Sequence, residues 1–93
     1  MAERCVHITI SGQVQGVGFR WWAVNKAKTL GVNGWIRNHK NGSVEALLSG
    51  DTRAVNSMIK ECRNGSSLAI VDNVQIDEGE KPSIAGFYQA LTI

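Results

Sequence analysis

The feature that most restricts the fold is a change of hydrophobic period near the start of the chain. Residues 5–11 alternate between apolar and polar side chains, which is the pattern of a strand with one buried face. Residues 21–30 carry apolar side chains at helical spacing instead, and Gly31 is suited to end a helix. The chain therefore begins with a strand, a glycine-rich loop and a helix.

Local signals predict the elements that follow. Asn41-Gly42 is a hairpin signal because both residues tolerate positive φ. Asp51 is a suitable cap for a second helix, which Asn64-Gly65 would end. The predicted ranges are 34–38 and 43–49 for the hairpin strands, 51–64 for the capped helix, 70–77 for a strand, 78–83 for a loop and 87–93 for a last strand.

This order of elements predicts an α+β fold. Strand, helix, strand, strand, helix, strand, with an extra strand at the end, gives a ferredoxin-like two-layer sandwich. We expect an antiparallel sheet with both helices on one face. A chain of 93 residues fills one core, so residues 1–93 are predicted to form a single domain. The pattern does not indicate which sheet edge the last strand joins.

Composition excludes several classes of protein. The net charge is only +2 and the basic residues are scattered, which is a weak footprint for nucleic acid. No apolar run approaches the ~20 residues of a membrane span, and the start lacks the apolar core of a signal peptide. We therefore expect a soluble cytoplasmic protein, a monomer by default. Cys5 and Cys62 are predicted to be free thiols of undecided reactivity.

The loop after the first strand is the main functional candidate. Gly12 to Arg20 read Gly-Gln-Val-Gln-Gly-Val-Gly-Phe-Arg. Such a loop can turn several backbone N–H groups around one point and cradle a phosphate or similar oxyanion. Its glycines also suit a plain strand-to-helix turn. Arg20 favours the first reading, because a cation is poorly placed at a helix N-terminus unless an anion joins it.

Topology predicts a partner for this loop. The first and second strands run in the same direction, so Asn38 and the glycine loop should lie at one end of the sheet. With one strand between them, the gap is about 10 Å, and a long arginine, an amide and an anion would fill it. Asn38 could also simply make local hydrogen bonds at a strand end.

The residues from Ser11 to Gly50 resemble the acylphosphatase family in two separate motifs. The first is the run Gly12–Arg20, and the second is Gly31-Val32-Asn33-Gly34-Trp35-Ile36-Arg37-Asn38, followed by a turn and Gly42-Ser43-Val44. The resemblance implies a small hydrolase of acyl phosphates that uses no metal, no other cofactor and no phosphoenzyme. It also implies that Asn38 positions the attacking water. The phosphate would be held by Arg20 and by the loop amides of Gln15, Gly16, Val17, Gly18 and Phe19.

The sequence departs from the family pattern in places. Gln13 stands where a basic residue is frequent, which predicts weaker substrate affinity. His39 is expected to be an exposed turn residue, and His7 to face solvent without a role; the two make a poor metal site. Trp21 and Trp22 are expected to pack beside the loop.

Other readings stay open. The same fold also serves RNA-binding modules, but here Trp35 and Tyr88 are among the few aromatic side chains on the open sheet face. Similar domains also begin larger carbamoyl-transfer maturation proteins. Because the chain ends soon after its last strand, we expect a stand-alone enzyme whose partner is a small acyl phosphate and not a nucleic acid or a membrane.

Overall fold

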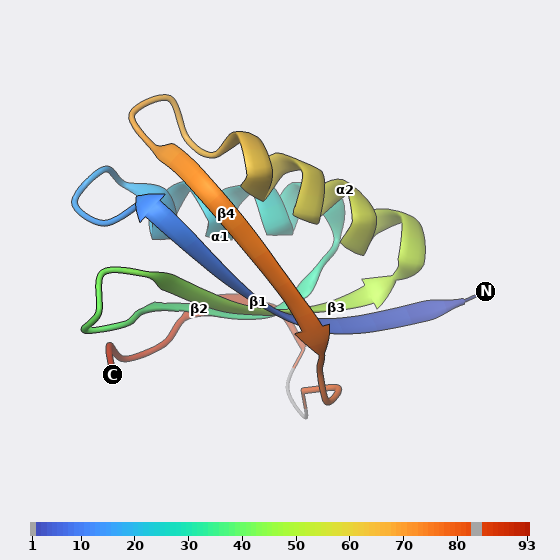
Figure 1. Cartoon of the computed structure of the whole chain (residues 1–93). Coiled ribbons are helices and arrows are strands. Elements are labelled where there is room, and N and C mark those ends of the chain that lie inside the picture. Colours follow the sequence, from blue (N-terminus) through green and yellow to red (C-terminus); the bar gives the residue numbers. More distant parts are fainter. Residues whose placement is uncertain (1, 83–84) are drawn as a thin grey trace.

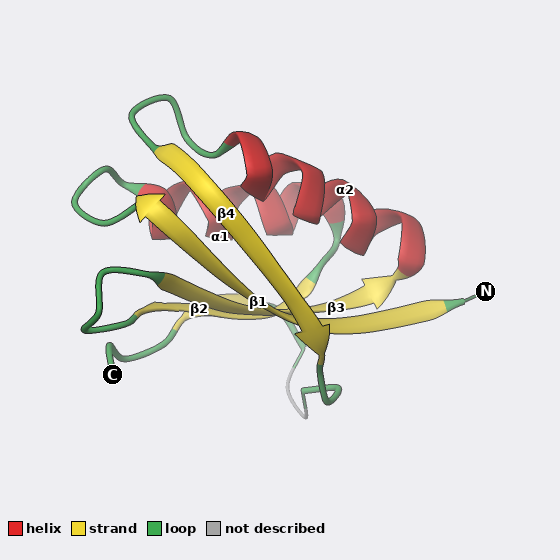
Figure 2. Cartoon of the chain, in the orientation of Figure 1, coloured by secondary structure: helices red, strands yellow, loops and turns green. Residues whose placement is uncertain are grey.

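The computed structural model describes residues 2–82 and 85–93, which form a sheet with a layer of helices on one face (Figure 1, Figure 2). The order of elements is the predicted one, and the predicted ferredoxin-like sandwich is confirmed. The elements are β1 (Glu3–Gln13), α1 (Phe19–Leu30), β2 (Asn33–Asn38), β3 (Val44–Asp51), α2 (Thr52–Asn64), β4 (Ile70–Glu78) and β5 (Phe87–Gln89).

The strand order is β4-β1-β3-β2-β5, and the sheet is mixed rather than antiparallel throughout. Every neighbouring pair is antiparallel except β2 and β5, which are parallel. The prediction of a wholly antiparallel sheet is therefore wrong at this edge. A strand that starts where β4 ends must run opposite to β4, which is the direction of β1 and of β2. Because β5 joins the β2 edge, it is parallel to its neighbour.

The last strand is shorter than predicted. Residues 87–89 form β5, whereas the prediction extended to residue 93. The chain nevertheless follows β2 further, because the N–H of Ala90 donates to the carbonyl of Ile36 at 2.8 Å and that of Ile93 to Asn38 at 3.2 Å. The main chain of residues 90–93 thus borders the end of β2 that carries Asn38.

The core lies between the sheet and the helices. β1 buries alternate side chains there, and Ile8 and Ile10 are fully buried. The predicted stripe of α2 is confirmed as its buried face, which consists of Val55, Met58, Ile59 and Cys62. Asp51 caps α2 as predicted, because its carboxylate accepts a hydrogen bond from the N–H of Arg53 at 3.1 Å.

Helix α1 begins two residues earlier than the predicted start at Trp21. Phe19 is 2% exposed, so burial of its ring in the core fixes the first turn. The buried face of α1 consists of Phe19, Ala23 and Ala27. The phosphate-loop candidate is thereby held between two core elements, β1 and α1.

The segment between β4 and β5 is held at both ends by hydrogen bonds that its main-chain N–H groups donate. The N–H of Gly79 donates to the carbonyl of Cys5 in β1 at 3.2 Å. At the other sheet edge, the N–H of Gly86 donates to the side-chain oxygen of Asn33 at 2.8 Å. Residue 83 of the predicted loop lies outside the described residues.

Both cysteines are free thiols, as predicted. Cys62 is fully buried in α2, and this burial raises the pKa of its thiol to about 12. Cys5 is half-buried, and burial raises its pKa more than a hydrogen bond with Ser49 lowers it. Neither thiol therefore has the lowered pKa of a reactive cysteine. Within the described residues, the helices are too short or too polar to cross a membrane.

Candidate active site

The loop between β1 and α1 is pinned at both ends by buried side chains. Val14 is 1% exposed and Phe19 is 2% exposed. Between them, Gly16 and Gly18 adopt positive φ values of 74° and 73°, which glycine alone adopts without strain. No side chain projects from either position. The loop therefore exposes main chain at its tip while its ends are anchored in the core.

The first turn of α1 provides main-chain donors that have no main-chain partner in the described part of the chain. Gly18 is the N-cap and has no side chain to cap the helix, and the first turn carries no acidic residue. The N–H of Trp22 makes the first helical bond, to the carbonyl of Gly18 at 3.0 Å. The earlier N–H groups of this turn have no intrahelical acceptor, and the helix end carries a partial positive charge. This end of α1 is suited to bind an anion.

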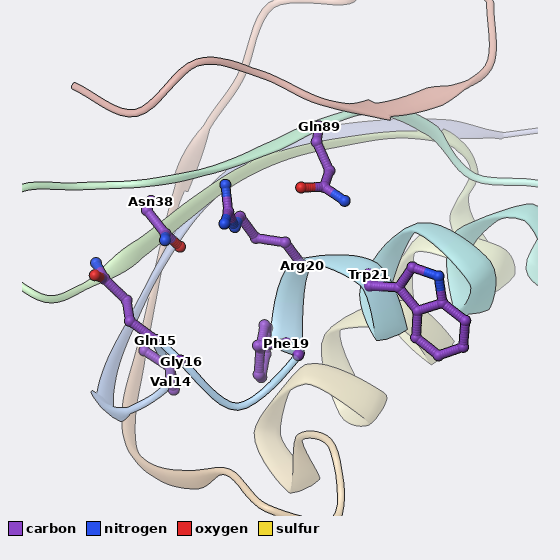
Figure 3. A pocket seen from close by; sticks show the side chains of 9 residues that line it. Val14, Gln15, Gly16, Phe19, Arg20, Trp21, Asn38 and Gln89 are labelled. Atoms are coloured by element: carbon purple, nitrogen blue, oxygen red, sulfur yellow. The ribbon is translucent and has the colours of Figure 1, made fainter.

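Arg20 adds a full positive charge to the same place. It is the second residue of α1 and is half-buried. Figure 3 shows its side chain reaching from the helix towards Asn38 and Gln89. Within the described part of the chain, Arg20 forms no ion pair. A guanidinium beside a helix N-terminus is electrostatically unfavourable on its own, so this site attracts an anion more strongly than the helix end alone would.

Asn38 reaches the site from the end of β2. Its backbone pairs with Val44 of β3, and its side-chain oxygen Oδ1 is buried without a hydrogen-bond partner among the described residues. Buried acceptors without a donor are uncommon in folded proteins. The position is therefore ready to accept a hydrogen bond from a bound molecule.

Gln15 connects the loop to the hairpin that carries Asn38. Its side-chain nitrogen Nε2 donates to the carbonyls of His39 at 2.7 Å and Ser43 at 2.9 Å. The hairpin is itself held by Asn41, whose Oδ1 accepts from the N–H of Ser43 at 2.9 Å and from its hydroxyl at 2.6 Å. These bonds set the distance between the loop and Asn38.

The loop, Arg20 and Asn38 surround one pocket of about 240 Å³ (Figure 3). The predicted convergence of Arg20 and Asn38 is thus observed. Val17 is not among the residues that line the pocket, because its side chain packs against the core. The lining residues are Val14, Gln15, Gly16, Gly18, Phe19, Arg20, Trp21, Asn38 and Gln89.

Known proteins are similar to this chain in sequence and in fold. The model of the Acylphosphatase family matches residues 6–88. The acylphosphatase of Acidiphilium cryptum (strain JF-5) is 43% identical over 92% of this chain and 94% of its own length. The chain belongs to the acylphosphatase family. The family match extends well beyond the two motifs between Ser11 and Gly50.

Two solved acylphosphatase structures have the same architecture. The acylphosphatase of Coxiella burnetii superposes with a TM-score of 0.89 at 33% identity, covering 95% of this chain and 93% of that one. The acylphosphatase of Bacillus subtilis superposes with a TM-score of 0.87 at 29% identity, covering 96% of this chain and 99% of that one. The sandwich and the mixed sheet edge of this chain are therefore those of acylphosphatases.

Three residues that line the pocket were not among the predicted site residues, namely Val14, Trp21 and Gln89. Gln89 lines the pocket because β5 joins the sheet beside β2, which no local pattern indicated. Trp21 was expected to pack, but it is 69% exposed. Of these two tryptophans, Trp22 is the one that packs against the core, with its ring centroid 5.3 Å from that of Phe19. The apolar stripe through Ala23 and Ala27 was the available signal, because it places Trp21 on the far side of the helix.

The two histidines also differ from expectation. His39 is half-buried rather than exposed, and its carbonyl is one of the acceptors of the Gln15 side chain. His7 lies on the open sheet face as predicted, but it has a partner, because its Nε2 is 3.0 Å from Oε2 of Glu45. No group of three metal-ligating side chains occurs within the residues described.

Glu45 is the centre of a polar cluster on that open face. Its carboxylate also accepts a hydrogen bond from Nε of Arg37, whose guanidinium lies 4.6 Å from the ring centroid of Trp35. Burial raises the pKa of Glu45, but the hydrogen bond and charge of Arg37, together with His7, outweigh burial and lower it overall. Glu45 does not line the pocket.

Proposed function

We propose that this acylphosphatase-family protein hydrolyses acyl phosphates to a carboxylate and inorganic phosphate, using the pocket between the loop, α1 and β2. The observation that carries the proposal is the meeting of Arg20 and Asn38 at the start of α1, where Oδ1 of Asn38 has no hydrogen-bond partner among residues 2–82 and 85–93. Arg20 binds the phosphate together with the main-chain amides of Gln15, Gly16, Val17, Gly18 and Phe19. Asn38 positions the attacking water.

The phosphate site combines a side-chain fork with main-chain donors. The planar guanidinium of Arg20 can give two parallel hydrogen bonds to phosphoryl oxygens. The N–H groups of the loop and first turn offer further donors without the entropic cost of ordering long side chains. Because the loop is anchored by Val14 and Phe19, these donors need not be reorganised as charge develops in the transition state.

The attacking water is held by Asn38. A neutral amide is not a base at pH 7, but its Oδ1 can accept a hydrogen bond from the water. In the proposed step, the water oxygen forms a bond to phosphorus while the bond between phosphorus and the acyl oxygen breaks. The electron pair leaves with the carboxylate, and the proton of the water passes to an oxygen of the substrate's own phosphate. A carboxylate is a good leaving group, so no acid, metal or cofactor is required.

The test is hydrolysis of benzoyl phosphate and acetyl phosphate by the purified protein in EDTA. We expect turnover of the wild type and a loss of about 10³-fold or more in kcat/KM for Arg20→Ala. Arg20→Lys should recover little of that loss, since lysine cannot make the two parallel bonds. Arg53→Ala, which removes an exposed arginine from the first turn of α2, should stay within twofold of wild type. A folded wild-type protein that hydrolyses neither substrate would reject the proposal.

We further infer that residues 1–93 act as one domain and as a cytoplasmic monomer whose only partner is its small-molecule substrate. Two free thiols favour a reducing compartment, and the net charge of +2 does not favour nucleic acid. Light scattering should give the monomer mass of 10.1 kDa. Salt-sensitive binding of single-stranded RNA would contradict the inference.

A further inference from the structure

We propose that Trp21 and Gln89 form the subsite for the acyl group, and that the enzyme consequently prefers planar apolar acyl groups to small ones. The inference rests on the proposed function. It concerns the two pocket residues to which neither phosphate binding nor water positioning gives a role.

The in-line geometry of phosphoryl transfer places the acyl group on the side of Trp21 and Gln89. In phosphoryl transfer, the attacking and leaving oxygens lie roughly in line through phosphorus. Figure 3 shows the Arg20 guanidinium between Asn38 on one side and Gln89 and Trp21 on the other. With the phosphate at Arg20 and the water at Asn38, the leaving carboxylate points away from Asn38. It therefore meets Gln89 and Trp21.

Trp21 carries a large apolar ring on that side of Arg20, and Figure 3 shows the ring directed outward from the first turn of α1, away from the guanidinium. The indole is 69% exposed, although it follows Arg20 directly in the first turn of α1. The other two tryptophans are engaged elsewhere, since Trp22 packs on Phe19 and Trp35 lies under Arg37. An exposed ring on a rigid helix loses little freedom when a flat partner stacks on it. A benzoyl group would bury part of both rings, whereas an acetyl group is too small to do so.

Gln89 offers a polar contact to the same group. It comes from β5, and Figure 3 shows its side chain pointing from that strand towards the Arg20 side chain, on the side away from Asn38. The amide makes no side-chain hydrogen bond that would occupy it among the residues described. Its N–H can donate to the carbonyl oxygen of the acyl group, on which negative charge grows as the carboxylate leaves. This contact would serve any acyl phosphate.

The test compares kcat/KM for benzoyl phosphate and acetyl phosphate. We expect Trp21→Ala to lower the benzoyl-to-acetyl ratio about 5- to 10-fold, the size of one aromatic stacking contact, and Trp21→Phe to restore most of it. Gln89→Leu should lower kcat/KM about 10-fold for both substrates alike. Tyr88→Ala is the control, because Tyr88 is an exposed aromatic residue of β5 that does not line the pocket.

The outcomes separate this inference from the function on which it rests. Active wild-type enzyme with an unchanged benzoyl-to-acetyl ratio in Trp21→Ala would overturn the subsite and leave the hydrolase intact. The same holds if Tyr88→Ala changes the ratio as much as Trp21→Ala does. Wild-type protein without activity on either substrate would overturn both proposals. Inhibition by inorganic phosphate, which has no acyl group, should change less than twofold in Trp21→Ala.

Discussion

The side-chain nitrogen of Gln15 lies 2.7 Å from the carbonyl oxygen of His39, and this hydrogen bond joins the loop between β1 and α1 to the hairpin that carries Asn38. A second bond reaches the carbonyl of Ser43, the residue directly before β3. Gln15 and His39 are 24 positions apart in the sequence. Their contact sets how far the proposed phosphate site lies from the proposed water site, and catalysis is sensitive to shifts of about 1 Å.

Loss of the Gln15 side chain should therefore impair turnover through Asn38. We expect Gln15→Leu, which keeps the volume and removes both bonds, to lower kcat about 10- to 100-fold. In an Asn38→Ala background, the same change should cost much less, because the group it positions is already gone. This coupling is measured by comparing kcat of the wild type, Gln15→Leu, Asn38→Ala and the double variant in steady-state kinetics. Gln13→Ala, at an exposed position, is the control, and equal losses in both backgrounds would contradict a positioning role.

Asn38 should matter for activity and hardly for stability. Asn38→Ala is expected to lower kcat about 10²- to 10³-fold while inhibition by inorganic phosphate stays within twofold. The free energy of unfolding should fall by less than about 0.5 kcal/mol, because the buried Oδ1 has no partner to lose within the described chain. Urea unfolding and initial rates give the two quantities.

Asn33, at the other end of β2, is the matched control. Its Oδ1 accepts a hydrogen bond from the N–H of Gly86 at 2.8 Å. Asn33→Ala should therefore cost about 1 kcal/mol of stability and leave kcat within twofold. If Asn38→Ala is the less stable and the more active of the two variants, the assignment of Asn38 is wrong.

The Glu45 cluster predicts a stability difference that depends on pH. The pKa of Glu45 is lowered in the folded protein from its ordinary value of 4.5. Folding thus favours the ionised carboxylate, and this contribution is fully present above the ordinary value and lost as the pH falls through the folded pKa. Glu45→Gln should lower the free energy of unfolding at pH 7, and the difference from wild type should shrink as the pH falls below 4.5.

Glu3 provides the comparison for this titration. Its ion pair with Lys81 spans 3.3 Å between side chains that are 63% and 71% exposed, and such pairs add about 0–1 kcal/mol at most. Glu3→Gln should change little at any pH. Unfolding curves in urea at several pH values test both variants, and an effect of Glu45→Gln that persists undiminished in acid would contradict the ionic origin.

Gly31, which ends α1, and Gly34 in β2 should differ sharply in their tolerance of a side chain. A Cβ on Gly34 would lie 1.8 Å from the carbonyl oxygen of Leu47 in β3, so the sheet itself must shift. Both glycines have positive φ, 136° at Gly34 and 75° at Gly31, but Gly31 has open space around it. We expect Gly31→Ala to cost about 1–2 kcal/mol and Gly34→Ala to cost more than about 4 kcal/mol. Thermal or urea unfolding measures the stability of both variants. Similar losses in Gly31→Ala and Gly34→Ala would show that backbone strain dominates over the contact with Leu47.

Much of the fold followed from local patterns. The alternation in β1, the stripe of α2 and the cap at Asp51 are determined by neighbouring residues, and the structure confirms them. The first turn of α1 was placed too late because burial of Phe19 depends on the assembled core. The direction of β5 relative to β2 was also missed, since the choice of sheet edge is a competition between distant segments.

The sequence by itself determined the order of elements, the glycine loop, and the presence of Arg20 and Asn38 at the same end of the sheet, because these depend on side-chain period and chain direction. Only the tertiary structure decided which side chains complete the pocket. The contact between Gln15 and His39, the entry of Gln89 from β5 and the outward turn of Trp21 all arise between elements that meet only after folding. Such contacts depend on packing across the sheet and helices, and no window of neighbouring residues contains that information.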